Sequence, residues 1–351
     1  MKVGFDAKKA IRNHTGIGNY SRRCIRAVEE TGAETELFYS SVPVLGELWR
    51  NFLQWLSVRR RHIDVYHGLS NELPFGIRWS GAKAVVTIHD LIFLRLPHTY
   101  GWLQRHILKI KTRYACKVAH RIVAVSEMTK HDIVHYYGID ASRIEVIYQS
   151  IDDAFRQMLD DNQLQAIAQQ YNLPHQFILC VGTIQQRKNQ HTLVKALPKL
   201  PSDMHLVLVG KEEEYGNLVR QTAQELDVAS RVHIYNGVPS DHLPAFYQLA
   251  SVFACLSRFE GFGIPLAEAL ASGTPVIAAT GSCLEEAGGP DSIYLGPDDV
   301  EGLTQSVLKI ISDKDFADNM VKKGRDYSLR FTDERLGQSL ATLYHSLVKR
   351  S

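Results

Sequence analysis

Two glutamates in a glycine-rich segment are the residues of this chain best suited to chemistry. Glu260 and Glu268 have seven residues between them, in the run Glu260-Gly-Phe-Gly-Ile-Pro-Leu-Ala-Glu268. Pro265 favours a first helical turn, where its missing N–H would have no partner. The unpaired amides and the dipole of such a helix form a site for an anion such as a diphosphate. Either carboxylate alone could be a solvated or capping group, but Gly261 and Gly263 would let a ligand approach the main chain closely, which favours a site.

Two cations follow the first predicted strand of the second half. Arg187 and Lys188 end the run Gly-Thr-Ile-Gln-Gln-Arg-Lys. A phosphorylated leaving group needs positive charge near its oxygens, without necessarily needing a metal. The alternative is a solvated pair of side chains before a helix.

The first half also places candidate groups after predicted strands. Gly16 and Gly18 lie in a glycine loop, residues 13–20, before a helix. Such a pair alone is weak evidence for a phosphate site. His89 follows another strand, where a lone histidine is usually structural, and Asp90 is expected to fix that loop.

Two further motifs are interpreted as structural. Ser126 opens a predicted helix, and a helix cap is favoured over contact with an acceptor phosphate. Asp313-Lys-Asp315 lies in a polar turn between late helices, and we reject it as a metal site. The sequence has no His/Cys cluster with metal-ligand spacing, so we expect neither a metal nor a cofactor.

Short apolar runs alternate with amphipathic stretches along the whole chain, as in strands joined through helices into parallel sheets. Strands are expected at 3–6, 36–39, 65–67, 84–88, 122–125 and 144–147, and again at 177–181, 205–209, 232–235, 252–256, 275–278 and 293–295. This α/β rhythm predicts two Rossmann-like domains. We place the first at 1–165, the second at 166–330, and a terminal helix crossing back to the first domain at 331–351.

Composition narrows the class of protein. With 45% hydrophobic and 22% charged residues among 351, the chain should fold. No apolar run is long enough to span a bilayer, and because the first residues have the pattern of a buried strand we do not expect them to be a signal peptide. Five scattered cysteines without a Cys-x-x-Cys spacing suit a reduced, cytosolic setting. Residues 1–150 carry 22 basic and 13 acidic side chains, whereas 151–351 carry 18 and 25. The two halves should therefore meet different partners.

The segment around the two glutamates resembles a known motif. Residues 259–277, Phe-Glu-Gly-Phe-Gly-Ile-Pro-Leu-Ala-Glu-Ala-Leu-Ala-Ser-Gly-Thr-Pro-Val-Ile, look like the E-x7-E motif of retaining GT-B glycosyltransferases, family 4, of a mannosyltransferase-like kind. The resemblance implies a GT-B fold, with two domains facing across a cleft. It implies that Glu260 contacts the transferred sugar and stabilises its charge, and that Glu268 holds the donor ribose. Donor sugar and diphosphate would then be bound along Gly261, Phe262, Gly263, Ile264, Pro265 and Leu266.

The loop that holds the two cations resembles the donor-phosphate loop of the family. Lys188 matches, but Thr183 stands where many members have arginine. We hypothesise that Arg187 supplies the missing charge. Val238 lies at what looks like the base-binding edge, where backbone atoms contact the base.

In the first half the resemblance adds roles to three residues. Gly16 and Gly18 would lie against the donor phosphate and the acceptor, and His89 beside the donor sugar. Two basic stretches with tryptophan, residues 48–61 and 102–121, could lie on an anionic membrane surface. The alternative is a core-facing helix with a solvated basic face.

Together these expectations describe a retaining glycosyltransferase that needs no metal, with GDP-mannose as the favoured donor and a glycan or lipid-linked acceptor, as in polysaccharide or lipopolysaccharide synthesis. It would work in the cytoplasm, peripherally at the inner face of the membrane. The alternatives are a nucleotide-sugar epimerase or phosphorylase on the same fold, or a non-catalytic nucleotide-sugar binder. The acidic second half opposes nucleic-acid binding.

Overall fold

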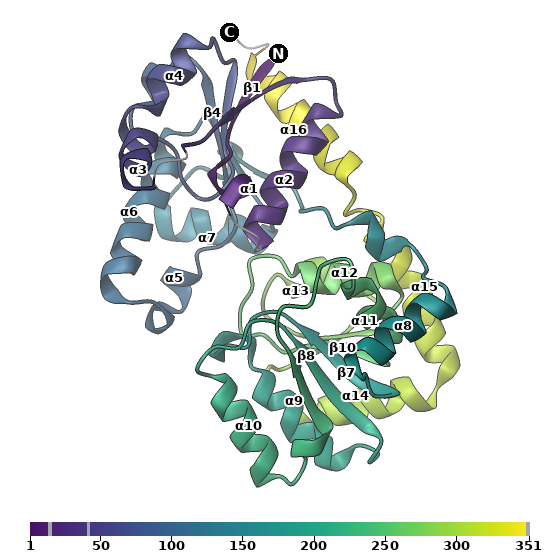
Figure 1. The fold of residues 1–351 in the computed structure, drawn as a ribbon. Coiled ribbons are helices and arrows are strands. Elements are labelled where there is room, and N and C mark those ends of the chain that lie inside the picture. Colours follow the sequence, from purple (N-terminus) through teal and green to yellow (C-terminus); the bar gives the residue numbers. More distant parts are fainter. Residues whose placement is uncertain (13–15, 41–42, 349–351) are drawn as a thin grey trace. The chain divides into compact units, whose positions relative to one another are not determined.

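The structure, a computed structural model, describes residues 1–12, 16–40 and 43–348. Within these, the chain divides into two compact units, Met1–Ser150 with the segment from Phe331 onward, and Ile151–Arg330. Each unit is an open parallel sheet with helices packed against it (Figure 1). The twelve predicted strands are all present, and no bound differs by more than two residues from the prediction.

The sheet of the first unit has the order β2-β1-β3-β4-β5-β6. Its strands are β1 (Lys2–Asp6), β2 (Glu34–Phe38), β3 (Val65–Gly68), β4 (Lys83–Ile88), β5 (Arg121–Ala124) and β6 (Ile144–Val146). Its helices are α1 (Lys8–Arg12), α2 (Gly16–Glu29), α3 (Pro43–Phe52), α4 (Gln54–Arg60), α5 (Ile92–Arg95), α6 (Trp102–Val118), α7 (Glu127–Tyr137) and α16 (Asp333–Val348).

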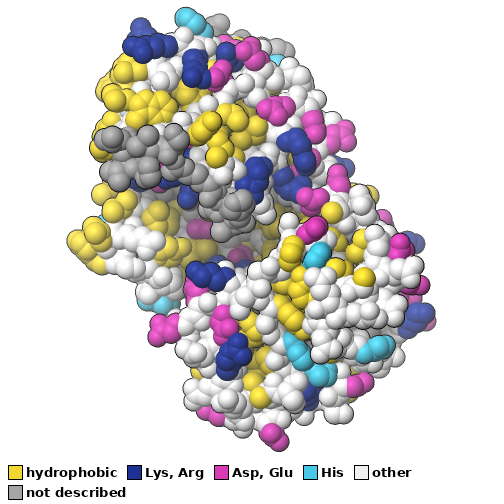
Figure 2. All heavy atoms as spheres, viewed as in Figure 1, with side chains coloured by type: hydrophobic (Ala, Val, Ile, Leu, Met, Phe, Trp, Pro, Cys, Tyr) yellow, Lys and Arg dark blue, Asp and Glu magenta, His cyan; other side chains and the backbone are white. Residues whose placement is uncertain are grey.

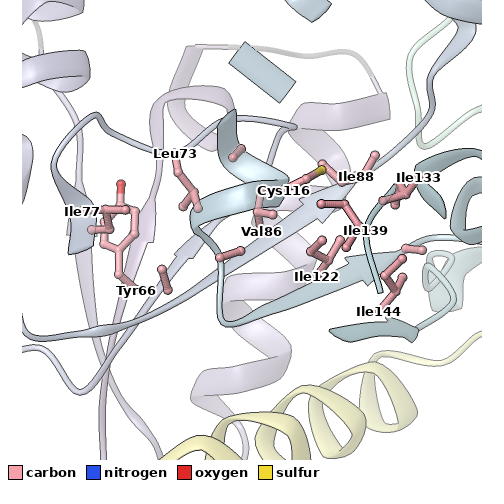
Figure 3. Close-up of a cluster of buried hydrophobic side chains, with 14 of the residues drawn as sticks. Tyr66, Leu73, Ile77, Val86, Ile88, Cys116, Ile122, Ile133, Ile139 and Ile144 are labelled. Atoms are coloured by element: carbon pink, nitrogen blue, oxygen red, sulfur yellow. The ribbon is translucent and has the colours of Figure 1, made fainter. Parts of the chain in front are cut away.

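Alternating apolar side chains of these strands fill two cores, one on each face of the sheet. Val86 and Ile122 belong to the core shared with α4, α6 and α7, part of which Figure 3 shows together with Cys116 and Ile133 from those helices. Val85, one residue along β4, belongs to the opposite core, which α2 and α16 cover. A strand that is apolar on both faces must be buried, and this is why runs without polar alternation predicted these strands well.

The last helix is part of the first unit. α16 packs against α2 (Figure 1), closely enough that a Cβ on Gly337 would meet the carbonyl oxygen of Ala27. Its first residue, Asp333, accepts from Arg23 at 3.2 Å and forms an ion pair with Arg26. These charges fix the start of the helix, and Tyr344 fixes its other end through a hydrogen bond described below.

The sheet of the second unit has the order β12-β11-β10-β7-β8-β9. Its strands are β7 (Gln176–Val181), β8 (Met204–Val209), β9 (Val232–Tyr235), β10 (Val252–Cys255), β11 (Val276–Ala279) and β12 (Ile293–Leu295). Its helices are α8 (Asp161–Tyr171), α9 (Gln190–Ala196), α10 (Gly216–Glu225), α11 (Leu243–Leu249), α12 (Ile264–Ser272), α13 (Leu284–Gly288), α14 (Val300–Ser312) and α15 (Lys314–Ser328).

The break between the units follows Ser150, earlier than the expected boundary at residue 165. Residues 151–165 pack on the second unit, because the Phe155 ring lies against Tyr247 and its carbonyl accepts from Ser272 at 3.2 Å. The polar, glutamine-rich α8 resembled a linker in the sequence. Its neighbour in the fold is α11, so it belongs to the second unit.

Candidate functional site

The loop between β10 and α12 carries the two glutamates, and the strand, loop and helix predicted there are confirmed. Gly263 precedes the helix with φ +107°, and Gly273 ends it with φ +79°. A Cβ on Gly263 would lie 2.8 Å from the Leu284 side chain. Both the backbone conformation and the packing at this position therefore require glycine.

Glu260 is nearly buried and forms ion pairs with both candidate cations. Its carboxylate lies 2.9 Å from Nη1 of Arg187 and 2.7 Å from Nζ of Lys188. Burial alone would raise the pKa of Glu260, but the two positive charges outweigh it and lower that pKa to about 2. The carboxylate is therefore ionised at neutral pH and suited to stabilising positive charge, not to donating a proton.

Main-chain contacts join the loop of the two cations to the glutamate loop. Arg187 donates from Nη1 to the Phe259 carbonyl at 2.5 Å, and its own carbonyl accepts from the Arg258 amide at 2.8 Å. Lys188 lies close over Gly182, whose φ of +133° suits glycine. The structure thus brings Arg187 and Lys188 together with Glu260, which follows Lys188 by 72 residues in the sequence (260 − 188).

Thr183, where the family often has arginine, holds its loop through the main chain. Its carbonyl accepts from the Gln190 side chain at 3.0 Å. The positive charge of this loop comes from Arg187 and Lys188, whose side chains are 14% and 11% exposed.

Glu268 lies on α12 and has a fixed orientation. The buried Tyr247 hydroxyl donates to its Oε2 at 2.8 Å. Burial and then the neighbouring carboxylate raise the Tyr247 pKa, so the phenol stays protonated and keeps donating.

The other residues of the predicted donor segment differ in how far they are buried and in whether their amides already have partners. The side chains of Phe262 and Leu266 are buried, so only their main chain faces a ligand. The amide of Leu266, which is expected to bind the donor, donates to the Gly263 carbonyl at 2.9 Å in this structure. A tight first turn at the glycine cap satisfies it internally. Gly261, Ile264 and Pro265 are half-buried.

A buried cysteine supports this loop, which the sequence analysis did not anticipate. The Cys283 thiol donates toward the Glu260 and Phe262 carbonyls at 3.0 and 3.3 Å. Cys283 comes from the connection after β11, and a lone cysteine carries no local signal for such a contact.

In the first unit, His89 is buried at the end of β4. Its Nε2 lies 2.9 Å from the Leu69 carbonyl, which can only accept, so Nε2 carries the proton. Burial lowers the His89 pKa to about 4, although that hydrogen bond opposes the change. The imidazole is neutral at pH 7. As expected, Asp90 fixes the loop by accepting from the Ile92 amide at 3.1 Å.

Next to His89 lies a series of hydrogen-bonded polar side chains that sequence reasoning missed. Tyr344 of α16 lies 2.6 Å from Nδ1 of His67, and Nε2 of His67 lies 2.8 Å from the Thr87 hydroxyl. That hydroxyl lies 3.1 Å from the hydroxyl of Tyr20, whose ring packs edge-on against His89. These contacts thus connect α16 to the side chain that packs against His89.

The remaining candidates are placed as follows. Gly16 and Gly18 lie in the first turns of α2, not in a loop, because the helix begins at Gly16; residues 13–15 of that motif are outside the described part. Ser126 caps α7 by accepting from the Thr129 amide at 3.0 Å, as predicted. Val238 is half-buried in the connection after β9.

Asp313 caps α15, accepting from the Phe316 amide at 3.0 Å. Across the described ranges, no group of three or more His, Cys, Asp or Glu side chains is arranged to hold a metal ion. In that same part of the chain, no helix combines the length and the apolarity needed to cross a bilayer.

Comparison with protein families gives two matches that follow one another along the chain. Residues 15–155 match the model for Glycosyltransferase Family 4, and residues 156–327 match that for Glycosyl transferases group 1. The point where they meet lies close to the break between the structural units.

Among curated relatives, the chain is 25% identical over 295 residues to O-antigen chain mannosyltransferase B of Escherichia coli, covering 81% of this chain and 74% of the relative. It is 27% identical to O-antigen chain mannosyltransferase RfbU of Salmonella typhimurium, over 64% of this chain and 60% of that one. It is 30% identical to a GDP-mannose-dependent phosphatidylinositol monomannoside mannosyltransferase of Mycobacterium tuberculosis, over 66% and 62%. The match spans less than two thirds of the last two relatives.

Solved structures show the same fold. Anabaena HepE in complex with UDP aligns with a TM-score of 0.77 at 19% identity, over 99% of this chain and 100% of that one. A sucrose-phosphate synthase of Thermosynechococcus elongatus aligns with a TM-score of 0.79 at 19% identity, over the whole of both. The predicted GT-B class, two Rossmann-like units with parallel sheets, is confirmed.

Proposed function

The chain belongs to the group 1 glycosyltransferases, and from that premise we propose that it moves a hexose, with GDP-mannose as donor, to a glycan or lipid-linked acceptor with retention of configuration. The observation that carries this proposal is the ionised Glu260 between Arg187 and Lys188, beside the first turn of α12. The relatives named as mannosyltransferases support the choice of sugar.

Each group has a defined task in the proposed reaction. Arg187 and Lys188, with the amides at the start of α12, stabilise the negative charge of the leaving diphosphate. Glu260 accepts from sugar hydroxyls and stabilises the positive charge that develops on the ring. Glu268, oriented by Tyr247, accepts from the donor ribose. The diphosphate departs from the face that the acceptor hydroxyl enters.

We propose that no metal takes part, because the two cations supply positive charge where the diphosphate leaves. Turnover in excess EDTA should equal that in added Mg²⁺ or Mn²⁺. A rate that disappears with EDTA and returns with the metal would contradict this.

The test of the main proposal is donor turnover by the full chain with GDP-mannose, UDP-glucose and other nucleotide sugars. UDP-glucose is included because HepE was solved with UDP and with UDP-glucose. Glu268→Ala should abolish turnover, whereas the exposed Glu225→Ala on α10 serves as a matched control. Equal turnover by both variants would reject the assigned site, and release of a sugar phosphate only when inorganic phosphate is added would indicate a phosphorylase.

The relatives also support a proposal for the acceptor and the location. We propose a role in polysaccharide or lipopolysaccharide synthesis at the cytoplasmic face of the membrane, with the protein bound peripherally. The O-antigen relatives and the basic first half support this. Product analysis with lipid-linked and free glycan acceptors tests it, and transfer confined to free sugars would oppose it.

A further inference from the structure

Helix α6 is apolar on the side that faces away from the core of the first unit. Leu103, Ile107 and Ile110 are 64%, 46% and 64% exposed, and their spacing places them on one face. The opposite face buries Ala115 and Cys116 against the sheet. A helix that is apolar on both sides normally has a second partner.

The apolar stripe continues into a cavity of about 600 Å³. Tyr114 and Val118 extend the same helical face, and the cavity is completed mainly by Phe52, Phe75 and Trp79. Phe75 stacks on Phe52 and packs against Tyr114, with ring centroids 5.3 and 4.6 Å apart. Trp79 is 67% exposed at the rim. Figure 2 shows apolar side chains gathered over this part of the unit, where Figure 1 places α3, α4 and α6.

A second cavity, of about 590 Å³, adjoins the first and shares Arg78 and Val118 with it. Its lining adds Lys117, Arg121 and Arg143. Within the described ranges, these four basic side chains form no ion pair with a carboxylate. Arg78 and Arg143 instead donate to carbonyls at the end of α6, including that of Lys117 at 3.0 and 3.3 Å.

Both the position in the fold and the chemistry indicate the occupant. Arg121 begins β5 and Arg143 precedes β6, so the basic cavity lies at the amino ends of the strands. His89 follows the carboxyl end of β4, at the other edge of the same sheet. An apolar cavity next to a cationic one matches a molecule with a hydrocarbon chain and a phosphate. Because the basic cavity and His89 lie at opposite ends of the strands, that molecule is an anchor and not a reacting substrate.

We propose that these two cavities form one site for an anionic phospholipid of a bilayer, with an acyl chain in the aromatic cavity and the headgroup phosphate in the basic one. The stripe of α6 lies on the same membrane surface. The inference builds on the peripheral membrane partner proposed above and gives it a defined site, but it does not depend on the identity of the donor.

The test is co-sedimentation of the full chain with vesicles of phosphatidylcholine alone or of equimolar phosphatidylcholine and phosphatidylglycerol. The Lys117→Gln/Arg121→Gln variant should bind the anionic vesicles more weakly by about fivefold per charge removed. Trp79→Ser/Ile110→Ser should weaken binding to both vesicle types, because it removes exposed apolar surface. Arg335→Gln on α16 and Leu329→Ser, both exposed, are the matched controls and should bind like the wild type.

Wild-type binding that is equal for both vesicle types, or unchanged in both double variants, would overturn the site. Inorganic phosphate that binds the protein while vesicles do not would show a phosphate site instead. Donor turnover is measured separately on the same proteins. Lost vesicle binding with turnover intact supports the anchor, whereas vesicle binding without any turnover would refute the proposed function and leave the anchor standing.

Discussion

Replacing Glu260 by glutamine tests the electrostatics of the site, because the substitution removes the negative charge that pairs with two nearly buried cations, Arg187 and Lys188. The pKa of Glu260 is about 2 instead of 4.5. Since each tenfold change in an equilibrium is worth about 1.4 kcal/mol, the surroundings stabilise the ionised form by about 3 kcal/mol. Loss of one partner of a buried pair costs about 3–5 kcal/mol in other proteins, so the two figures agree.

The sign and the assay follow from this pKa. Because the folded-state pKa lies below the unfolded value, the stabilisation is fully present above pH 4.5 and is lost as the pH falls toward 2. At pH 7, E260Q should therefore melt roughly 6–12 °C below the wild type for a unit of this size. Circular dichroism and calorimetry measure this shift, and GDP-mannose turnover should fall at the same time.

A double-mutant cycle isolates the ion pair. Lys188→Met should destabilise the wild type but cost less in the E260Q background, where the lysine no longer has its carboxylate. Glu225→Gln serves as the surface control. A melting temperature of E260Q within about 2 °C of the wild type, or strictly additive effects of the two substitutions, would refute the reasoning.

Three further predictions concern backbone strain, the terminal helix and pH. Gly263→Ala should cost about 1–3 kcal/mol and lower donor turnover, because φ is +107° there; Gly296→Ala, which has room for a Cβ, is the control in melting and activity assays. Asp333→Asn removes the charge that pairs with Arg26, so limited proteolysis should cleave α16 faster, and an unchanged rate would count against that role. The pKa values of His67 and His89 are about 3 and about 4 in the folded chain, against an ordinary 6.5, so on acidification the unfolded chain binds protons at a higher pH than the folded chain does. The free energy of unfolding should therefore fall between pH 6.5 and 4. A melting temperature that stays constant over this range would contradict the reasoning.

The sequence was most informative where one local pattern determines the structure. The strands were predictable because buried parallel strands are continuous apolar runs, and the turn into α12 because Gly263 and Pro265 constrain it. The pairing of Arg187 with Glu260 was not predictable, since it depends on how two distant loops meet. Asn189 helps to fix the contact between these loops, with φ +59° and a side chain that donates to the Leu256 carbonyl at 3.3 Å.

Other parts of the site depended on contacts that leave no local pattern. The Cys283 thiol contacts the glutamate loop, and a series of hydrogen bonds runs from Tyr344 to Tyr20. Both join segments that are far apart in the sequence. The start of the second unit was misplaced for the same reason, because a polar helix such as α8 does not show in its own residues which neighbour it packs against.

The membership of α16 in the first unit has a consequence for biosynthesis. Residues 151–330 form a complete unit, whereas the first unit needs both residues 1–150 and a helix that is translated after the second unit. On the ribosome, the second unit can therefore finish folding while the first still lacks the helix that covers one of its cores. Until α16 emerges, the apolar side chains of α2 beneath it stay open to chaperones and to other chains. Loss of this one helix should therefore harm the yield of the protein more than its short length suggests.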